Sequence, residues 1–181
     1  TVSTAIADLG ERESVRDLAT TLLAEHPGID TLVHNAGALS AERRVNSDGI
    51  EVTVASQVLG PFLLTSLLLP ALAAATATGR VITVSSGGMY ATGLTVRHLQ
   101  MSERGYKGSE QYARAKRAQV TLNEMWAQRV PAAQVVFHAM HPGWADTPGV
   151  EEALPTFRKI TGPLLRSVEE GADTMMWLAA D

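Results

Sequence analysis

The sequence of 181 residues contains 45% hydrophobic and 19% charged residues and carries a formal net charge of −4. These values are typical of one globular domain covering residues 1–181, and the acidic balance argues against nucleic acid or an anionic membrane as a partner. The chain contains no cysteine, which excludes a disulfide framework and a thiolate metal site and fits the reducing cytoplasm in which we expect the protein.

Apolar runs and helical spacing predict strands that alternate with helices along the chain. The predicted strands are Val2 to Ala7, Thr31 to His34, Val81 to Val84 and Gln134 to Met140. The predicted helices begin near Ser14, extend from Ser47 to Leu69, carry Tyr112 and Lys116 as far as Arg129, and run from Ser167 to Ala180. The longest apolar run, Pro61 to Ala75, is interrupted by Pro70, so we expect it to be too short to span a bilayer and predict no membrane segment.

Alternating strands and helices favour an α/β fold with a parallel sheet that is covered by helices on both faces. Each predicted strand is followed by a cluster of Gly, Ser, Asn or Asp, and ligands of such sheets bind outside the carboxyl ends of the strands. We therefore expect four positions to converge on one edge of the sheet: Asp8, Asn35, Ser86 and the Pro142–Gly143 pair.

A tyrosine and a lysine four residues apart, Tyr112 and Lys116, lie on one face of a predicted helix. A lysine ammonium in that place is expected to lower the pKa of the phenol, which is then able to give or take a proton at a reacting oxygen. Ser86, at the end of a predicted buried strand, is placed to hold the same oxygen. The three side chains suit carbonyl/alcohol redox chemistry, although a Tyr-x-x-x-Lys pair without its context is weak evidence.

Taken together, these features resemble the short-chain dehydrogenase/reductase family. The matching residues are Asp8-Leu9, Asn35-Ala36-Gly37, Ser86, Tyr112-x-x-x-Lys116, Pro142-Gly143 and Thr147. Each of them follows the expected strand or lies on the expected helix, across nearly the whole chain. A more specific likeness, to the dehydrogenase/reductase family member 12 group, rests on three segments: Arg80 to Met89, Met140 to Val150 and Gly171 to Leu178.

The resemblance implies a three-layer Rossmann-like fold, NAD or NADP as cofactor, and a small-molecule alcohol or carbonyl substrate. Tyr112 would be the general acid/base, Lys116 would lower its pKa and hold the nicotinamide ribose, and Ser86 would orient the substrate oxygen. The implied cofactor contacts are Asp8 and Leu9 at the adenine, Asn35, Ala36 and Gly37 through the main chain, and Pro142, Gly143, Trp144 and Thr147 at the nicotinamide end. Dimerisation through two long helices is common in the family, so the resemblance also implies a homodimer.

The chain departs from the family at its beginning. No Gly-x-x-x-Gly-x-Gly turn precedes Asp8, so the first two strands and the glycine-rich turn are missing, and we expect a fragment of a longer protein. In the family's strand order 3-2-1-4-5-6-7, the segment Val2 to Ala7 would lie ~14 Å from Thr31 to His34. We therefore predict a first strand that is detached, or re-paired with the edge of Thr31 to His34, and weak dinucleotide binding by this chain alone.

A second departure is Gln57, which stands where the family usually has an asparagine whose main-chain carbonyl holds a proton-relaying water. Pro61 has no N–H to donate to the carbonyl four residues back, which is that of Gln57. We therefore expect Gln57 to keep the relay role through its carbonyl oxygen and count it among the catalytic residues. The alternative is that Pro61 only kinks the helix.

Two other sites can be drawn on the sequence, and both are disfavoured. His138, His141 and Asp146 span a strand-to-loop transition that opposes convergence, so no metal site is predicted. A hydrolase triad of Ser86, His141 and Asp146 lacks the Gly-x-Ser-x-Gly elbow. A different class of function stays open, namely a non-catalytic binding or interaction module that keeps the fold. The asparagine-to-glutamine change and the absent glycine turn favour that alternative.

Overall fold

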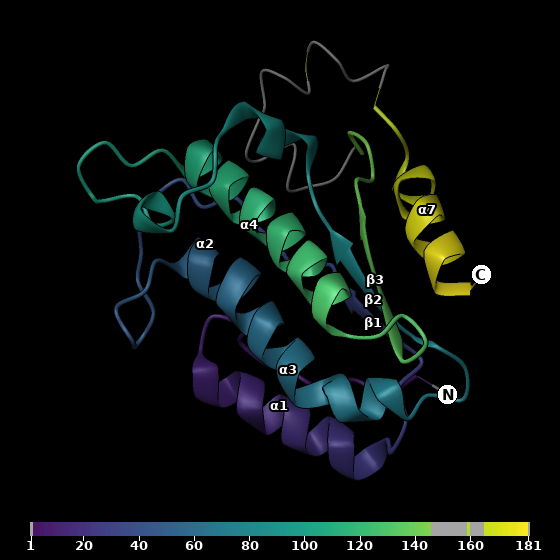
Figure 1. The fold of residues 1–181 in the computed structure, drawn as a ribbon. Helices are drawn as coiled ribbons and strands as arrows, with labels where there is room; N and C mark the ends of the chain where they lie inside the picture. Colours follow the sequence, from purple (N-terminus) through teal and green to yellow (C-terminus); the bar gives the residue numbers. More distant parts are fainter. Residues whose placement is uncertain (1, 146–158, 160–164, 181) are drawn as a thin grey trace.

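Three parallel strands form the sheet at the centre of the fold (Figure 1). The structure is a computed structural model that describes residues 2–145, 159 and 165–180. The strands lie in the order β1 (Thr31–His34), β2 (Gly79–Val84) and β3 (Val135–Met140), and each agrees with a predicted strand to within about two residues. The predicted parallel sheet is confirmed.

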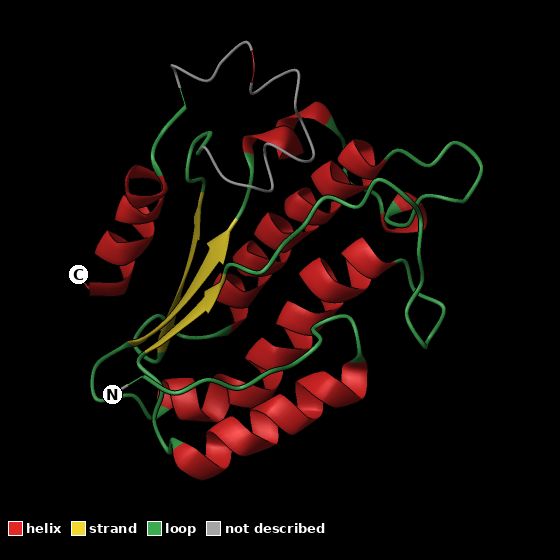
Figure 2. Ribbon diagram, turned by 180° about the vertical axis from the view of Figure 1, so that it is seen from behind, coloured by secondary structure: helices red, strands yellow, loops and turns green. Residues whose placement is uncertain are grey.

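Helices cover both faces of this sheet (Figures 1 and 2). One face carries α3 (Gly60–Ala73) and α4 (Gly108–Arg129), with α1 (Arg12–Glu25) packed outside α3, and the other face carries α7 (Val168–Ala180). Shorter elements complete the described chain: α2 (Val52–Val54), the π-helical turn η1 (Ala55–Leu59), and the 3₁₀ helices η2 (Gly87–Ala91) and η3 (Val96–His98). The arrangement is the expected three-layer α/β architecture.

The main hydrophobic core lies between the sheet, α3 and α1. Leu68 and Leu72 on α3 are fully buried there, against Val15 on α1 and against Val81 and Val135 on neighbouring strands. A second, smaller cluster joins η1 to α4 through Val54, Val58, Ala115 and Ala118. The two clusters fix α3 and α4 against the same face of the sheet and thereby position the side chains at its carboxyl edge.

The segment Val2 to Ala7 is not a strand, and this prediction is wrong. Val2 and Ile6 are exposed, and β1 is hydrogen-bonded to β2 alone within the described residues. A strand needs a hydrogen-bonding neighbour, and the neighbour that the family's strand order would give this segment, the second strand, is not among these 181 residues. The prediction that this segment is detached from the sheet is confirmed.

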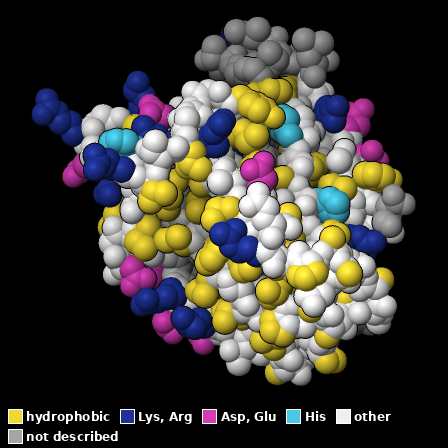
Figure 3. All heavy atoms as spheres, viewed as in Figure 1, with side chains coloured by type: hydrophobic (Ala, Val, Ile, Leu, Met, Phe, Trp, Pro, Cys, Tyr) yellow, Lys and Arg dark blue, Asp and Glu magenta, His cyan; other side chains and the backbone are white. Residues whose placement is uncertain are grey.

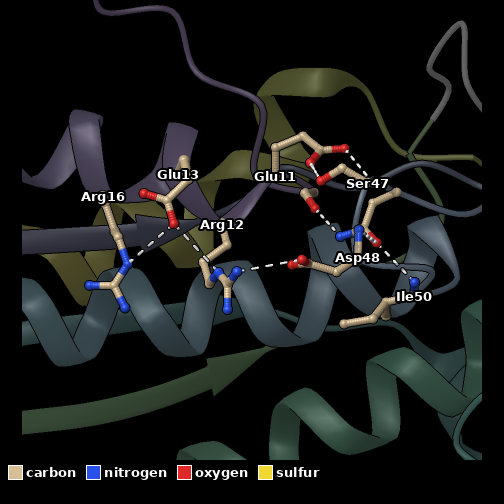
Figure 4. Close-up of polar contacts among 9 residues, drawn as sticks. Glu11, Arg12, Glu13, Arg16, Ser47, Asp48 and Ile50 are labelled. Atoms are coloured by element: carbon tan, nitrogen blue, oxygen red, sulfur yellow. Dashed lines mark hydrogen bonds and ion pairs between the residues drawn. The ribbon is translucent and has the colours of Figure 1, made fainter.

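The helix predicted from Ser47 begins later, at Val52. Asn46 Oδ1 accepts hydrogen bonds from the amides of Asp48 and Ile50, so the chain turns before it can become helical. Figure 4 shows how this turn is tied to the start of α1, where Glu11 binds Ser47 and Arg12 lies 3.5 Å from Asp48. The same helix continues through Pro70 to Ala73, because the loss of one backbone hydrogen bond is offset by burial of the residues around it.

The helical stretch Val52–Ala73 is the one segment, in the part of the chain that the structure describes, that is long and apolar enough to cross a membrane. Its mean hydropathy is 1.8 over the most apolar window, and 56% of that window is buried inside the fold. The expectation that this region is too short to span a bilayer was wrong, because the helical stretch begins at Val52, well before Pro61. Its packing against α1 and the sheet is typical of a core helix.

A small, mainly apolar cavity of about 20 Å³ lies between the sheet, α3 and α4. His34 on β1 faces it, and its Nε2 is 2.7 Å from Thr65 Oγ1 on α3. The Gln119 side chain from α4 also borders the cavity, and neither of its amide atoms has a hydrogen-bond partner among the described residues. Burial lowers the pKa of His34 from 6.5 to about 4, so the imidazole is neutral in the folded chain at neutral pH.

Acid should therefore destabilise the fold through His34. The unfolded chain binds a proton at this imidazole below its ordinary pKa of 6.5, whereas the folded chain does so only near 4. Stability is thus retained above pH 6.5 and is lost as the pH falls towards 4, by roughly 2 kcal/mol between about pH 7 and about pH 5. Urea unfolding at the two pH values measures this loss. The H34Q variant should lack the His34 share of it, and an identical pH dependence in both chains would contradict the assignment.

Candidate active site

Ser86 and Tyr112 meet at the carboxyl edge of the sheet. Ser86 lies two residues after the end of β2 and caps η2, with its Oγ accepting a hydrogen bond from the Gly88 amide at 3.2 Å. Tyr112 lies on the first half of α4, half-buried, and forms a side-chain hydrogen bond with Ser86. The sequence predicts this meeting because strand β2 ends at the edge along which α4 runs.

Lys116 lies one helical turn after Tyr112 and is 3% exposed. Its Nζ donates a hydrogen bond to the Val84 carbonyl at 2.8 Å and lies 5.5 Å from the centroid of the Tyr112 ring. Burial lowers the pKa of Lys116 to about 8, because the charged form loses hydration. The ammonium is therefore held by the carbonyl of Val84, the last residue of β2, two residues before Ser86.

The pKa of Tyr112 is raised, not lowered as the sequence analysis expects. Burial of the phenol raises it, and the hydrogen bond with Ser86 opposes only part of that rise. Lys116 does not lower the pKa of Tyr112 here, because its Nζ faces the ring and donates to the Val84 carbonyl. In this structure the phenol is a proton donor at neutral pH, which suits protonation of a carbonyl oxygen during reduction.

Gly37 brings the loop after β1 against Lys116 and Gln57. A Cβ atom placed on Gly37 would lie 3.1 Å from Gln57 Oε1 and 3.3 Å from Lys116 Nζ. Gln57 is held in place by its Nε2, which donates to the Ala38 carbonyl at 2.6 Å. Asn35 and Ala36 precede Gly37 on the same exposed loop. The predicted convergence of this loop with the Ser-Tyr-Lys group is thus observed.

The helix that carries Gln57 is wound as a π-helical turn in front of Pro61, not as a simple kink. The Gly60 amide donates to the Ala55 carbonyl, five residues back. Such turns are often found at functional sites. A relay through the Gln57 main-chain carbonyl stays a prediction.

Asp8 and Leu9 reach the same helix from the N-terminal side. Asp8 Oδ1 accepts a hydrogen bond from the Gly10 amide at 2.8 Å, which closes a tight turn. The Leu9 carbonyl packs so closely on Gly60 that a Cβ there would lie 2.1 Å from its oxygen, so only glycine fits. The two residues therefore lie beside the start of α3, and their contact with adenine stays a prediction.

The loop after β3 contributes Pro142, Gly143 and Trp144. Gly143 has a φ of 81°, a left-handed conformation that favours glycine, and the Arg166 side chain packs over it. The Trp144 carbonyl accepts a hydrogen bond from the Arg166 amide at 2.8 Å, which joins this loop to the start of α7. Thr147 and Asp146 lie outside the described residues.

Several contributors to the site were not predicted from the sequence. The Val84 carbonyl holds Lys116, and Ser85, which is buried, donates a weak 3.4 Å hydrogen bond to the Lys116 carbonyl. A main-chain carbonyl is present at every residue, so the sequence does not indicate which one accepts from Lys116. The serine pair Ser85 and Ser86 did indicate where β2 ends. Among the described residues, no group of three or more His, Asp or Glu is arranged to hold a metal.

The residues present fit the ribose end of a nicotinamide cofactor. Lys116 offers a buried ammonium, Gly37 leaves room for close approach, and the Gln57 Oε1 atom is a buried acceptor with no partner among the described residues. These are the groups that bind sugar hydroxyls. The pyrophosphate end would require a glycine-rich turn, which these 181 residues do not contain.

Sequence comparison identifies relatives over most of the chain. The family profile described as short chain dehydrogenase matches residues 1–156. The human protein named dehydrogenase/reductase SDR family member 12 is 43% identical over 174 residues, which are 96% of this chain and 54% of that protein. Mouse retinol dehydrogenase 14 is 33% identical over 178 residues, which are 95% of this chain and 53% of that protein.

Structural comparison gives the same fold. The crystal structure of a short chain dehydrogenase from Escherichia coli CFT073, complexed with NADPH, has a TM-score of 0.73 at 21% identity and matches 97% of this chain and 68% of that chain. The Rossmann-like fold and the resemblance inferred from the sequence are thereby confirmed. The chain spans about half the length of the curated relatives it matches.

Proposed function

Because the chain belongs to the short-chain dehydrogenase family, we propose that it supplies the catalytic residues of an NAD(P)-dependent oxidoreductase that interconverts an alcohol and a carbonyl compound. The observation that carries this proposal is the contact of Ser86 with Tyr112 at the sheet edge, with Lys116 over the phenol ring. The serine hydroxyl and the phenol would together hold a substrate oxygen, with the ammonium beside the phenol ring.

Each residue then has a distinct task. When bound, the cofactor supplies or accepts the hydride. Ser86 orients the substrate oxygen through its hydroxyl, and Tyr112 gives that oxygen a proton during reduction or removes one during oxidation. Lys116 lies beside the phenol ring, where its ammonium would hold the nicotinamide ribose. The family resemblance would bring the nicotinamide end close to Gly37 and to the loop after β3.

A turnover assay tests the proposal directly. The longest reading frame that contains these 181 residues should be expressed and mixed with NADPH or NADH and a panel of aldehydes and ketones. Consumption of the reduced cofactor, followed by its absorbance, is the expected result. The assay also separates NAD from NADP, which the chain leaves open because the discriminating residue of such folds follows a strand that these residues lack.

The second candidate is a non-catalytic binding or interaction module. It is favoured by the role of Ser86 as a helix cap, which gives its hydroxyl a structural function. A protein that binds NADPH but turns over none of the panel would support it. The catalytic reading is preferred because Lys116 is buried beside the phenol, and burying an ammonium costs stability that a purely structural site does not need.

Two expectations about the whole protein also stay proposals. A homodimer through α3 and α4 is supported by exposed apolar side chains on these helices, Phe62 on α3 and Met125 on α4. Figure 3 shows hydrophobic side chains at the surface of the face on which the two helices lie. Light scattering of the purified protein tests it. The cytoplasmic location is tested by cell fractionation.

A further inference from the structure

Arg166, which lies two residues before the start of α7, contacts the turn after β3, residues 141–144, in three ways. Its main-chain amide donates a hydrogen bond to the Trp144 carbonyl at 2.8 Å. Its side chain packs over Gly143, and its Nη1 donates a long hydrogen bond of 3.5 Å to the Pro142 carbonyl. One arginine, 24 residues beyond Pro142 in the sequence, therefore contacts three successive residues of this turn.

The packing of this side chain requires a glycine at position 143. A Cβ atom placed there would lie 2.9 Å from Arg166 Cδ and 3.0 Å from its Nε, which is closer than atoms in ordinary van der Waals contact. Gly143 also has a φ of 81°, which a residue with a side chain rarely adopts. The Arg166 side chain therefore occupies the space that a side chain at position 143 would take.

The first residue of the same turn, His141, contacts the loop that carries Ser86. A Cβ atom placed on Gly87 would lie 3.0 Å from His141 Nε2, so the imidazole lies against the main chain next to Ser86. Burial, and then the nearby charge of Arg166, lower the pKa of His141, so the imidazole is neutral at neutral pH. The turn is thus held by Arg166 and by the loop after β2.

The position of the Arg166 guanidinium is not set by a surface ion pair. Within residues 2–145, 159 and 165–180, Arg166 forms no salt bridge. Glu170 instead caps α7, because its Oε2 accepts from the Ser167 amide at 2.8 Å and its own amide donates to Ser167 Oγ at 3.1 Å. Ordering a long side chain costs conformational entropy, and here the contacts with the turn offset that cost.

We propose that Arg166 is a positioning residue for the nicotinamide end of the cofactor, which it serves by holding the turn of residues 141–144 in place. The inference rests on the proposed function, because the family resemblance is what assigns this turn to the nicotinamide. Arg166 transfers no proton and acts only through the turn. A displacement of about 1 Å in a reacting group can cost about a hundredfold in rate, so the placement of this turn matters to turnover.

Arg166→Ala tests this role in the full reading frame, with NADPH or NADH and a carbonyl compound that the protein reduces. Loss of the side chain frees the turn, so the KM for the dinucleotide should rise about tenfold while the KM for the carbonyl compound stays within about twofold. Arg166→Lys keeps an aliphatic chain over Gly143 and should recover part of the loss. Arg166 is exposed, so neither substitution opens a cavity in the core.

R129A is the matched control. Arg129 is also exposed and donates to a main-chain carbonyl, that of Met125 at 3.0 Å, but it lies at the end of α4 that leads into β3 and not at the carboxyl edge of the sheet. Its loss should leave both KM values unchanged. An R166A enzyme with the same KM values as R129A would overturn the proposal.

A double-mutant cycle between positions 143 and 166 tests the contact itself. G143A introduces backbone strain in both backgrounds but displaces Arg166 only where the arginine is present, so its effect on dinucleotide affinity should be about fivefold smaller in R166A. Fluorescence titration with NADPH and NADH measures this affinity without turnover.

The outcomes of the cycle separate this inference from the proposed function. Additive effects of G143A and R166A would overturn the role of Arg166 even in an active enzyme. A coupled cycle in a protein that binds the dinucleotide but reduces no carbonyl compound would overturn only the oxidoreductase proposal. A protein that binds neither dinucleotide would overturn both.

Discussion

Replacing Tyr112 with phenylalanine is expected to lower kcat about a thousandfold while the affinity for NADPH stays within about twofold. The phenol oxygen is the group placed to exchange a proton with the substrate, and proton transfer by a positioned side chain is worth about 10²- to 10⁴-fold. The ring remains in place, so Lys116 keeps its neighbour and the fold keeps its packing. Steady-state kinetics and cofactor fluorescence on the full reading frame provide the two measurements.

Tyr106→Phe is the matched control for this experiment. The Tyr106 hydroxyl also makes a hydrogen bond, to Glu51 Oε1 at 2.9 Å, so its removal perturbs the chain by the same chemical change. It should reduce stability but leave kcat near that of the parent. Equal turnover in Y112F and the parent enzyme would rule out the proton-transfer role, and a large loss of NADPH affinity in Y112F would show that the phenol acts in binding.

The sheet and its helices were predictable because their signals are local. β2 and β3 are apolar runs bounded by polar clusters, and α4 ends at Arg129 just before Pro131, which cannot continue a helix. Parallel strands then bring their carboxyl ends to one edge, whatever the details of packing. This is why the meeting of Ser86 with Tyr112 followed from the sequence.

The wrong predictions concern segments whose local sequence pattern favours one structure while contacts with residues far along the chain decide another. Val2 to Ala7 has strand-like composition but no neighbouring strand to bond with, and Ser47 resembles a helix cap but is bound to Glu11 instead. The direction of the Tyr112 pKa also escaped prediction. Sequence spacing places an ammonium near a phenol, whereas the pKa depends on how deeply both are buried and on which atom the ammonium faces.

Glu51→Ala is expected to lower the free energy of unfolding by roughly 4 kcal/mol, more than the other stability effects considered for this chain. Glu51 is fully buried and caps α2, with Oε2 accepting from the Val54 amide at 3.0 Å and Oε1 accepting from the Tyr106 hydroxyl. Its own amide donates to Gln100 Oε1 at 2.9 Å. Alanine removes the cap, leaves two donors unpaired and opens a cavity.

Urea unfolding of the 181-residue chain measures this loss, with Glu51→Gln as the control. Glutamine keeps a side-chain oxygen for one of the two donors, so E51Q should lose less than half as much stability as E51A. A loss in E51A below about 1 kcal/mol would show that the cap and the Tyr106 contact contribute little. Glu51 begins the helix whose next turn carries Gln57, which lies close to Lys116. E51A should therefore also broaden or shift the NMR signal of the Lys116 side chain. A loss of stability caused only by surface contacts would leave that signal unchanged.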